Sequence, residues 1–280
     1  MTEVRYVIKN KDRFMENKDG FIFEDPIYLP QFVGATSNPP DNQYLGTTNE
    51  VTVNPVDDMR KGDLCILVLQ AYGSGASISD SGGQSWISPS EWNSIIAENT
   101  GSTAVHYCVF NGSWSSSIKV NTTYNPNLGT NDVTAVMVVF RSWYRNWSID
   151  NLGLYTNRPK DPFQNPVPPE YYVTTIPAFQ NTEKWNVSLA MWFLPGVDRN
   201  NFSWTGLSGS NWIQEGLSSQ YRNWDGVEVS QNDGMSLAIA YQIATASFTA
   251  SAVSLTQVPA PQGTQSPMRP SYLGFSLYAY

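Results

Sequence analysis

Short apolar runs, separated by turn-forming residues, recur along the whole chain. Many of them alternate between larger apolar residues and smaller or polar ones, which is the period of a β-strand. The stretches between them are rich in glycine, proline, asparagine and serine, the residues of turns and loops. The clearest runs are residues 64–69, 104–110, 133–140, 186–191, 238–244 and 271–278. This pattern predicts an all-β protein built from many short antiparallel strands.

Five features of the first half recur in the second half in the same order. Each half has a strand entry ending in proline, a long apolar strand, a glycine-rich loop closing on tryptophan, a strand with a central tyrosine, and an apolar closing strand. The matched segments are 51–55 and 173–177, 64–69 and 186–191, 83–87 and 209–213, 104–110 and 238–244, and 133–140 and 271–278. Because the order is kept and the spacing drifts only slightly, we expect a tandem duplication. The predicted fold is two tandem pseudo-repeat antiparallel β-sandwich or jelly-roll halves.

The expected organisation has four parts. Residues 1–30 form an N-terminal arm, 31–143 the first sandwich copy, 144–170 a proline-rich connector and 171–280 the second copy. Proline stiffens the connector, so we expect sparse strand pairing there. We expect the arm to dock on another surface, and it carries an unusual share of the basic residues, namely Arg5, Lys9, Lys11, Arg13 and Lys18.

Alternation along the matched strands assigns side chains to the two faces of each sheet. Val105, Tyr107 and Val109 match apolar residues of the second copy, so we expect them to face the core. The same comparison places Cys65 inside and Cys108 outside. Two cysteines are too few for a disulfide framework, and we expect both to be free.

The first copy also carries a second apolar face, which the second copy lacks at the matched positions. It consists of Leu64, Ile66, Val68, Val136, Val138 and Phe140. Soluble monomers rarely expose such a face, so the N-terminal arm, the second half or a neighbouring subunit must cover it. We favour the second half or a neighbour, because the arm is mostly polar. With Trp143, Tyr144 and Trp147, these six are the candidate partner-binding residues.

Composition and charge argue against several functions. The net charge of -8 disfavours contact with a phosphate backbone, so we expect no nucleic-acid partner. No apolar run approaches the roughly 18 residues of a membrane-spanning helix, so no membrane partner is expected. The one histidine, His106, lies mid-strand and matches Ala240, which favours a structural role. Because a catalytic triad would have to use it, and no phosphate-loop or zinc motif is present, we expect a protein that is not an enzyme and has no cofactor or metal.

Acidic residues are the remaining candidates for catalysis or metal binding. They fall in or near predicted turns, where aspartate forms local hydrogen bonds, and none recurs in both copies. They are Asp57, Asp58, Asp63, Asp80, Glu91, Asp198, Asp225, Glu228 and Asp233. A calcium site at Asp57 and Asp58, or around Asp225 and Asp233, stays an open alternative.

Aromatic residues give the other functional signal. Those in or beside loops could stack on sugars, form protein interfaces or cap the sandwich ends, and the sequence leaves these three interpretations open. They are Trp92, Trp114, Trp143, Tyr144, Trp147, Tyr221 and Trp224. Trp86 and Trp212 close the glycine-rich loops, and we expect both to plug the core.

The order of these motifs resembles a duplicated β-sandwich, jelly-roll-like structural family of tailed-bacteriophage virions. The resemblance rests on Gly62-Asp63-Leu64 opening an apolar strand, a glycine-rich loop, Gly-x-x-Trp, an aliphatic-Tyr strand and an apolar closing strand. In the second copy Glu183-Lys184-Trp185 replaces the Gly-Asp entry. The resemblance implies a virion protein made in the host cytoplasm, such as a capsid decoration protein or a head or tail appendage. It also implies binding to other virion subunits and a homo-oligomer. The alternative is a lectin-like adhesin that binds a host-surface glycan or receptor.

Overall fold

The computed structural model describes strands and loops from both halves of the chain. The described residues are 5–9, 12–17, 20–22, 29–37, 50–72, 76–92, 94–96, 101–114, 118–122, 133–156, 173–197, 203–214, 234–258 and 271–280. Apart from a single-turn 3-10 helix, η1 (Ser90–Trp92), every regular element within these ranges is a strand. All the strand pairs are antiparallel. The expected all-β, antiparallel fold is confirmed.

The first half contains a five-stranded and a three-stranded sheet. The order of the larger sheet is β4 (Gln31–Ser37), β11 (Val133–Arg141), β6 (Leu64–Tyr72), β9 (Gly101–Val109) and β8 (Ser94–Ile96). The order of the smaller sheet is β5 (Glu50–Val53), β10 (Ile118–Thr122) and β7 (Ala76–Ser79).

The second half has the same arrangement with one added strand pair. Its larger sheet has the order β12 (Trp147–Thr156), β21 (Ser271–Ala279), β15 (Asn186–Val197), β18 (Gly234–Ala244) and β17 (Ile213–Gln214). Its three-stranded sheet is β13 (Val173–Ile176), β20 (Val253–Val258) and β16 (Ser203–Ser208). The added pair is β14 (Phe179–Asn181) with β19 (Phe248–Ala250).

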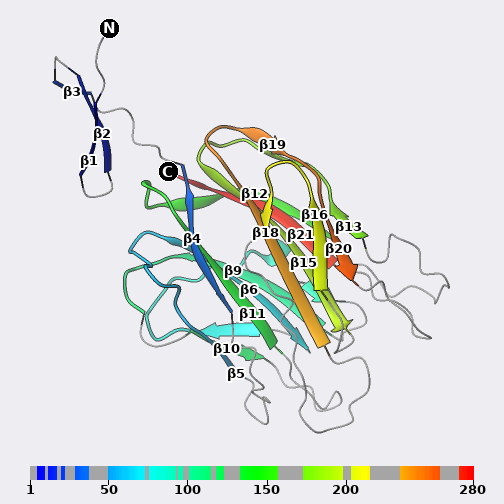
Figure 1. Cartoon of the computed structure of the whole chain (residues 1–280). Helices are drawn as coiled ribbons and strands as arrows, with labels where there is room; N and C mark the ends of the chain where they lie inside the picture. Colours follow the sequence, from blue (N-terminus) through cyan, green and yellow to red (C-terminus); the bar gives the residue numbers. More distant parts are fainter. Residues whose placement is uncertain are drawn as a thin grey trace.

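The N-terminal region forms a sheet of its own. Its strands are β1 (Arg5–Lys9), β2 (Asp12–Asn17) and β3 (Gly20–Ile22), and among the described residues they pair only with one another. Figure 1 shows this small sheet beyond the two larger halves.

The two halves pack through their five-stranded sheets, which gives four layers of strands. The first sandwich has its own core, containing Leu67 and Met137, between its two sheets. The second sandwich has an equivalent core that contains Trp192 and Leu255. Between the halves lies the largest apolar cluster, to which all three long strands of each five-stranded sheet contribute. Both faces of these sheets are therefore buried.

Aromatic side chains close the two sides of this central layer. On one side, Phe32 of β4 stacks on Tyr241 of β18, with the ring centroids 5.1 Å apart. On the other side, Trp92 of η1 lies against Phe275 of β21 at 4.1 Å, and its indole nitrogen donates a hydrogen bond to the Leu152 carbonyl of β12 at 2.6 Å. The first half thus places an aromatic ring against the second half on each side.

The central layer answers the question raised by the second apolar face of the first copy. All six of its side chains are at most 1% exposed and pack against Val187, Leu189, Met191, Phe193, Leu273, Phe275 and Leu277 of the second half. The sequence left the N-terminal arm, the second half or a neighbouring subunit as candidates to cover this face. In the structure the second half of the same chain covers it.

The face assignment within the second half needs correction. Ile66 lies opposite Tyr107 in the first half, and Leu189 lies opposite Tyr241 in the second, so Ile66 corresponds to Leu189 and not to Ser188. The sequence match of these strands was one residue out of register, and a slip of one residue exchanges the two faces. Ser188 and Ser276 therefore do not lie on an open face, since both are fully buried inside the second sandwich.

The expected placement of Cys108 on the outside is wrong. Cys65 and Cys108 are directly opposite one another on β6 and β9, and both point into the core of the first sandwich. They are at most 1% exposed and carry free thiols, as expected. Alternation failed here because both faces of β9 are buried, so apolar character does not distinguish them.

The connector is also better paired than expected. Trp147–Thr156 forms β12, an edge strand of the second five-stranded sheet, and pairs with β21 through two irregularities. The prolines of the connector lie outside the described residues. The second half therefore begins at β12, well before residue 171.

We predict that Ile66→Asp combined with Val138→Asp prevents folding. Each change places an unpaired carboxylate in the central layer, and two such burials exceed the roughly 5–15 kcal/mol of stability typical of a folded protein. Circular dichroism and thermal unfolding of the purified variant would measure the loss. Thr249→Asp, at an exposed position of β19, is the matched control and should unfold like the wild type. A folded double variant would show that water reaches the layer between the halves.

Candidate functional site

One end of the molecule carries most of the exposed aromatic surface of the described residues. We call it the aromatic end and define it as residues 143–146, 183–185 and 278–280. Trp143 is 60% exposed and Tyr280 is 57% exposed, while Tyr144 and Trp185 are half-buried. Soluble proteins seldom expose several large rings at one end without a partner.

Three segments from both halves meet at the aromatic end. The Tyr280 amide donates to the Asn146 carbonyl at 3.0 Å, and the Ala279 amide donates to the Trp185 carbonyl at 3.1 Å. The rings of Tyr144 and Trp185 lie 6.5 Å apart. These bonds fix the end of β21 against both the β11–β12 and the β14–β15 turns.

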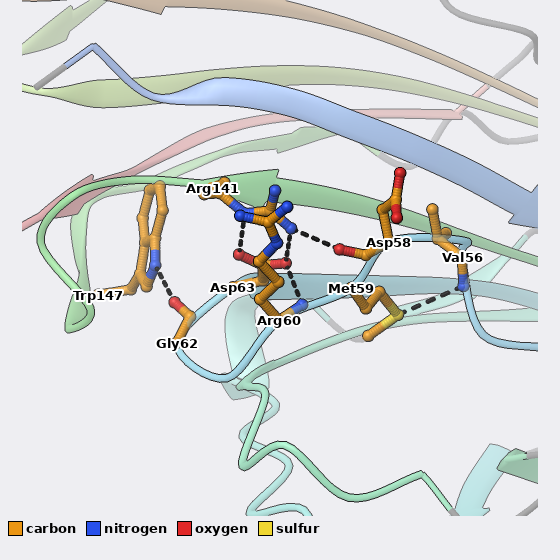
Figure 2. Close-up of polar contacts among 8 residues, drawn as sticks. All are labelled: Val56, Asp58, Met59, Arg60, Gly62, Asp63, Arg141 and Trp147. Atoms are coloured by element: carbon orange, nitrogen blue, oxygen red, sulfur yellow. Dashed lines mark hydrogen bonds and ion pairs between the residues drawn. The ribbon is translucent and has the colours of Figure 1, made fainter. Parts of the chain in front are cut away.

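A partly buried ion pair anchors the end of β11, the strand that leads to Trp143 (Figure 2). Asp63 is 2% exposed, and Arg141 at the end of β11 binds it with two hydrogen bonds of 2.8 Å. The same guanidinium donates to the Asp58 carbonyl at 2.6 Å, and the Arg60 amide donates to Asp63 at 2.7 Å. Hydrogen bonding to Asp63 raises the pKa of Arg141, so the guanidinium stays charged.

Trp147 ties the turn after Trp143 to the same loop. Its indole nitrogen donates to the Gly62 carbonyl at 3.2 Å, and its side chain is only 6% exposed (Figure 2). Gly62 has a φ of 97°, and a side chain there would collide with Arg145 at 2.9 Å. Glycine is therefore required at this turn.

Trp185 holds an unusual backbone conformation at the equivalent point of the second half, directly before β15. Its φ is 56°, a left-handed value that costs a bulky residue free energy. The surrounding contacts with Ala279 and Tyr144 hold it in place. This strain marks the aromatic end as a locally specialised surface.

The structure separates the residues predicted to bind a partner into two groups. Leu64, Ile66, Val68, Val136, Val138 and Phe140 are buried against the second half of the same chain and present no surface to another molecule. Trp147 is also buried. Trp143 is exposed and Tyr144 half-exposed, so these two are the members available to a partner.

Most of the other aromatic residues predicted in loops pack against the apolar cores. Trp92 is fully buried in the central layer, and Trp114 packs on Phe110 with the rings 5.9 Å apart. Trp212 is 7% exposed and donates to the Ser251 carbonyl at 3.0 Å, whereas Trp86 is half-buried and donates to the Asp80 carboxylate at 3.0 Å. Tyr221 and Trp224 lie outside the described residues.

The acidic residues that were candidates for catalysis or calcium binding do not form a shared site among the described residues. Asp80 caps its own loop, accepting hydrogen bonds from the amides of Gly82 and Gln84. Asp57 and Asp58 are exposed in a turn. Asp198, Asp225, Glu228 and Asp233 lie outside the described residues, and within the described ranges no three His, Cys, Asp or Glu side chains converge on a metal position.

His106 points into the first sandwich from β9. Burial lowers the pKa of this histidine to about 4, and its Nε2 atom is enclosed without a hydrogen-bond partner among the described residues. On the same face, the hydrogen bond between Cys65 and Cys108, together with burial, raises the pKa of the Cys65 thiol. Both groups are therefore neutral at physiological pH, which suits a core and not a nucleophile.

Sequence reasoning missed Trp185, Tyr280 and the Asp63–Arg141 pair. The first two are aromatic residues at the ends of apolar strands, the same signal that identified Trp143. The ion pair joins residues far apart in the chain, and only the neighbouring positions of β6 and β11 bring them together.

We predict that Arg141→Met lowers the free energy of unfolding by about 3 kcal/mol. The change leaves the buried Asp63 carboxylate without its cation, and such broken pairs cost about 3–5 kcal/mol, reduced here because Arg141 is 26% exposed. Chemical denaturation would measure the loss. Adding Asp63→Asn should recover part of it, whereas the exposed control Arg60→Met should cost little. Equal stability of Arg141→Met and the wild type would contradict a structural role for the pair.

We further predict a stability loss at acid pH that depends on His106. Its pKa is lower in the folded protein than the ordinary 6.5, so the unfolded chain binds more protons between pH 6.5 and 4. Folding stability contributed by the neutral imidazole is therefore complete above pH 6.5 and falls by roughly 3 kcal/mol as the pH drops to 4. Between pH 6.5 and 4 the free energy of unfolding should fall more steeply with decreasing pH for the wild type than for His106→Ala. At neutral pH the substitution itself should lower the free energy of unfolding by about 1 kcal/mol. Identical pH profiles would mean that His106 is solvated.

Comparison with known proteins assigns no family to this chain. No protein-family model matches it, no curated protein matches it, and no solved structure matches it. Within the described residues no helix is long and apolar enough to cross a membrane. The case for a function therefore rests on the geometry of the aromatic end and on the fold.

Proposed function

We propose that the chain is a non-enzymatic structural protein of a bacteriophage virion, a capsid decoration protein or a head or tail appendage component. It would bind other virion subunits through the aromatic end. The observation that carries this proposal is the pair of exposed rings, Trp143 and Tyr280, on a surface anchored by a buried ion pair. Large aromatic side chains in fixed positions are typical anchors of protein interfaces.

The fold supports an origin by tandem duplication, which the proposed family also implies. If the eight main strands of each half are numbered in chain order, both halves have sheets of order 1-8-3-6-5 and 2-7-4. This is the order of a jelly roll in which the short fifth strand has joined the other sheet. Jelly rolls are common in viral capsid proteins and lectins.

The matched positions of the exposed residues are consistent with this origin. The register that pairs Ile66 with Leu189 also places Trp143 at the position of Tyr280, each just past the end of a closing strand. Ile87 and Ile213 correspond in the same way, opposite Tyr107 and Tyr241, and are 49% and 48% exposed. Retention of exposed apolar residues at equivalent positions suggests that both halves contribute to the contact surface.

A carbohydrate-binding adhesin is the second candidate, and the exposure of Trp143 favours it. An indole ring that is 60% exposed can stack on a sugar ring, and the exposed side chains of Arg145, Asn146 and Glu183 nearby could form hydrogen bonds to hydroxyl groups. The two candidates use the same surface but differ in partner. The isolated protein should bind glycans only if the second candidate is right.

Assembly can be tested with a double variant at the aromatic end. We predict that Trp143→Ser with Tyr280→Ser folds normally but is incorporated into particles at least about tenfold less than the wild type, because an interface anchor is typically worth more than 1.4 kcal/mol. The readout is mass spectrometry of purified particles, with cryo-microscopy to locate the protein. Leu152→Ser with Thr249→Ser, at two exposed positions outside the residues that define this end, is the matched control.

The outcomes separate the candidates. Absence of the wild-type protein from particles would contradict the virion role, and equal incorporation of both double variants would contradict the aromatic end as the contact. Binding of the wild type to a glycan array, lost in the Trp143 and Tyr280 variant, would establish the adhesin instead.

A further inference from the structure

A row of polar side chains crosses the interior of the second sandwich, next to the aromatic end. Ser276, Ser188 and Gln242 are cross-strand neighbours on β21, β15 and β18, and they are 0%, 0% and 6% exposed. Asn181 of β14 donates to the Ser188 hydroxyl at 2.8 Å, and Asn186 precedes Ser188 by two residues on the same face of β15. Both asparagines are fully buried.

Four oxygen atoms of this row lack a hydrogen bond within the described part of the chain. They are Oδ1 of Asn181, Oδ1 of Asn186, Oε1 of Gln242 and Oγ of Ser276. Buried polar atoms in native proteins almost always have a partner, in the protein or in ordered water, because an unpaired buried oxygen has lost its solvent without compensation. Four such atoms on neighbouring positions point to one shared site and not to four separate defects.

The first sandwich is built differently at the corresponding positions. The register that aligns Tyr107 with Tyr241 places Val139, Cys65 and Cys108 where the second half has Ser276, Ser188 and Gln242. The same fold therefore accepts an apolar row at this place. The polar row of the second half is thus not required by the architecture.

The ends of the two sandwiches differ as well. In the first half the ionised Asp63 and Arg141 close the end of the core. At the corresponding positions of the second half stand Asn186 and Tyr278, which are uncharged, and Asn186 uses its amide nitrogen on the Glu183 carbonyl at 2.9 Å. The acceptor oxygen of Asn186 stays available to the interior.

We propose that this polar row lines an internal site that holds ordered water. The unpaired atoms are three amide carbonyls and one hydroxyl, so the occupant must donate hydrogen bonds, and one water molecule can donate two. The row has no carboxylate or cation, and a buried ion there would lack a counter-charge. A polar site with several acceptors within reach meets the requirements of buried water. The second sandwich is then hydrated at this row, whereas the first has the apolar side chains of Val139, Cys65 and Cys108 at the corresponding positions.

A crystal structure at near-atomic resolution tests the proposal directly. We expect water density within hydrogen-bond distance of at least two of the four oxygens, and none between Val139, Cys65 and Cys108 of the first half. A parallel crystal soaked in rubidium chloride should show no anomalous signal at the site. A dry site whose amides pair with one another, or a rubidium peak in place of water, would overturn the proposal.

Thermal unfolding provides a second test that does not need crystals. If water hydrogen-bonds the Ser276 hydroxyl, Ser276→Ala removes a satisfied partner and should lower Tm. If the hydroxyl is unpaired, the same change relieves a buried polar group and should raise Tm or leave it unchanged. Ser247→Ala, at an exposed position, is the control for the loss of a hydroxyl and should leave Tm unchanged. A raised or unchanged Tm for Ser276→Ala would overturn the proposal.

Discussion

The apolar layer between the two five-stranded sheets is the interaction on which the rest of the structure depends. Each of these sheets is apolar on both faces, so neither sandwich could present its large sheet to water. Packing the two sheets against each other buries an apolar face of each and joins the two halves into one unit. The ends of the strands are then the places where side chains can reach solvent, and the aromatic end lies there.

The same layer explains what could be predicted from the sequence and what could not. The strands, their antiparallel pairing and the need to cover Ile66 and Val138 followed from the alternation of apolar residues and the excess of apolar surface. The faces of Cys108 and Ser188 did not follow, because the central strands of both five-stranded sheets are buried on both sides, so apolar character does not distinguish their faces. Register, which decides the faces, is visible only in the pairing of the strands.

The candidate site was only partly predictable for a related reason. Trp143 could be identified because an aromatic residue beyond the end of a strand is a local signal. The Asp63–Arg141 pair could not, since its members are distant in sequence and each resembles an ordinary turn residue. The left-handed Trp185 also gave no signal, because tryptophan is a poor choice for that conformation and only its surroundings hold it there.

The matching ends of the two halves carry different residues. In the first half, a partly buried charge pair fixes the backbone that leads to Trp143. A backbone that is already ordered loses less entropy on binding, and this favours affinity without added area. In the second half, uncharged residues occupy the corresponding positions, and four oxygens of the polar row beside them take no hydrogen bond from the described protein groups. The proposed water must be immobilised there, at a cost in entropy. A fold with two similar sandwiches can tolerate this cost in one of them, because the shared apolar layer holds both halves together.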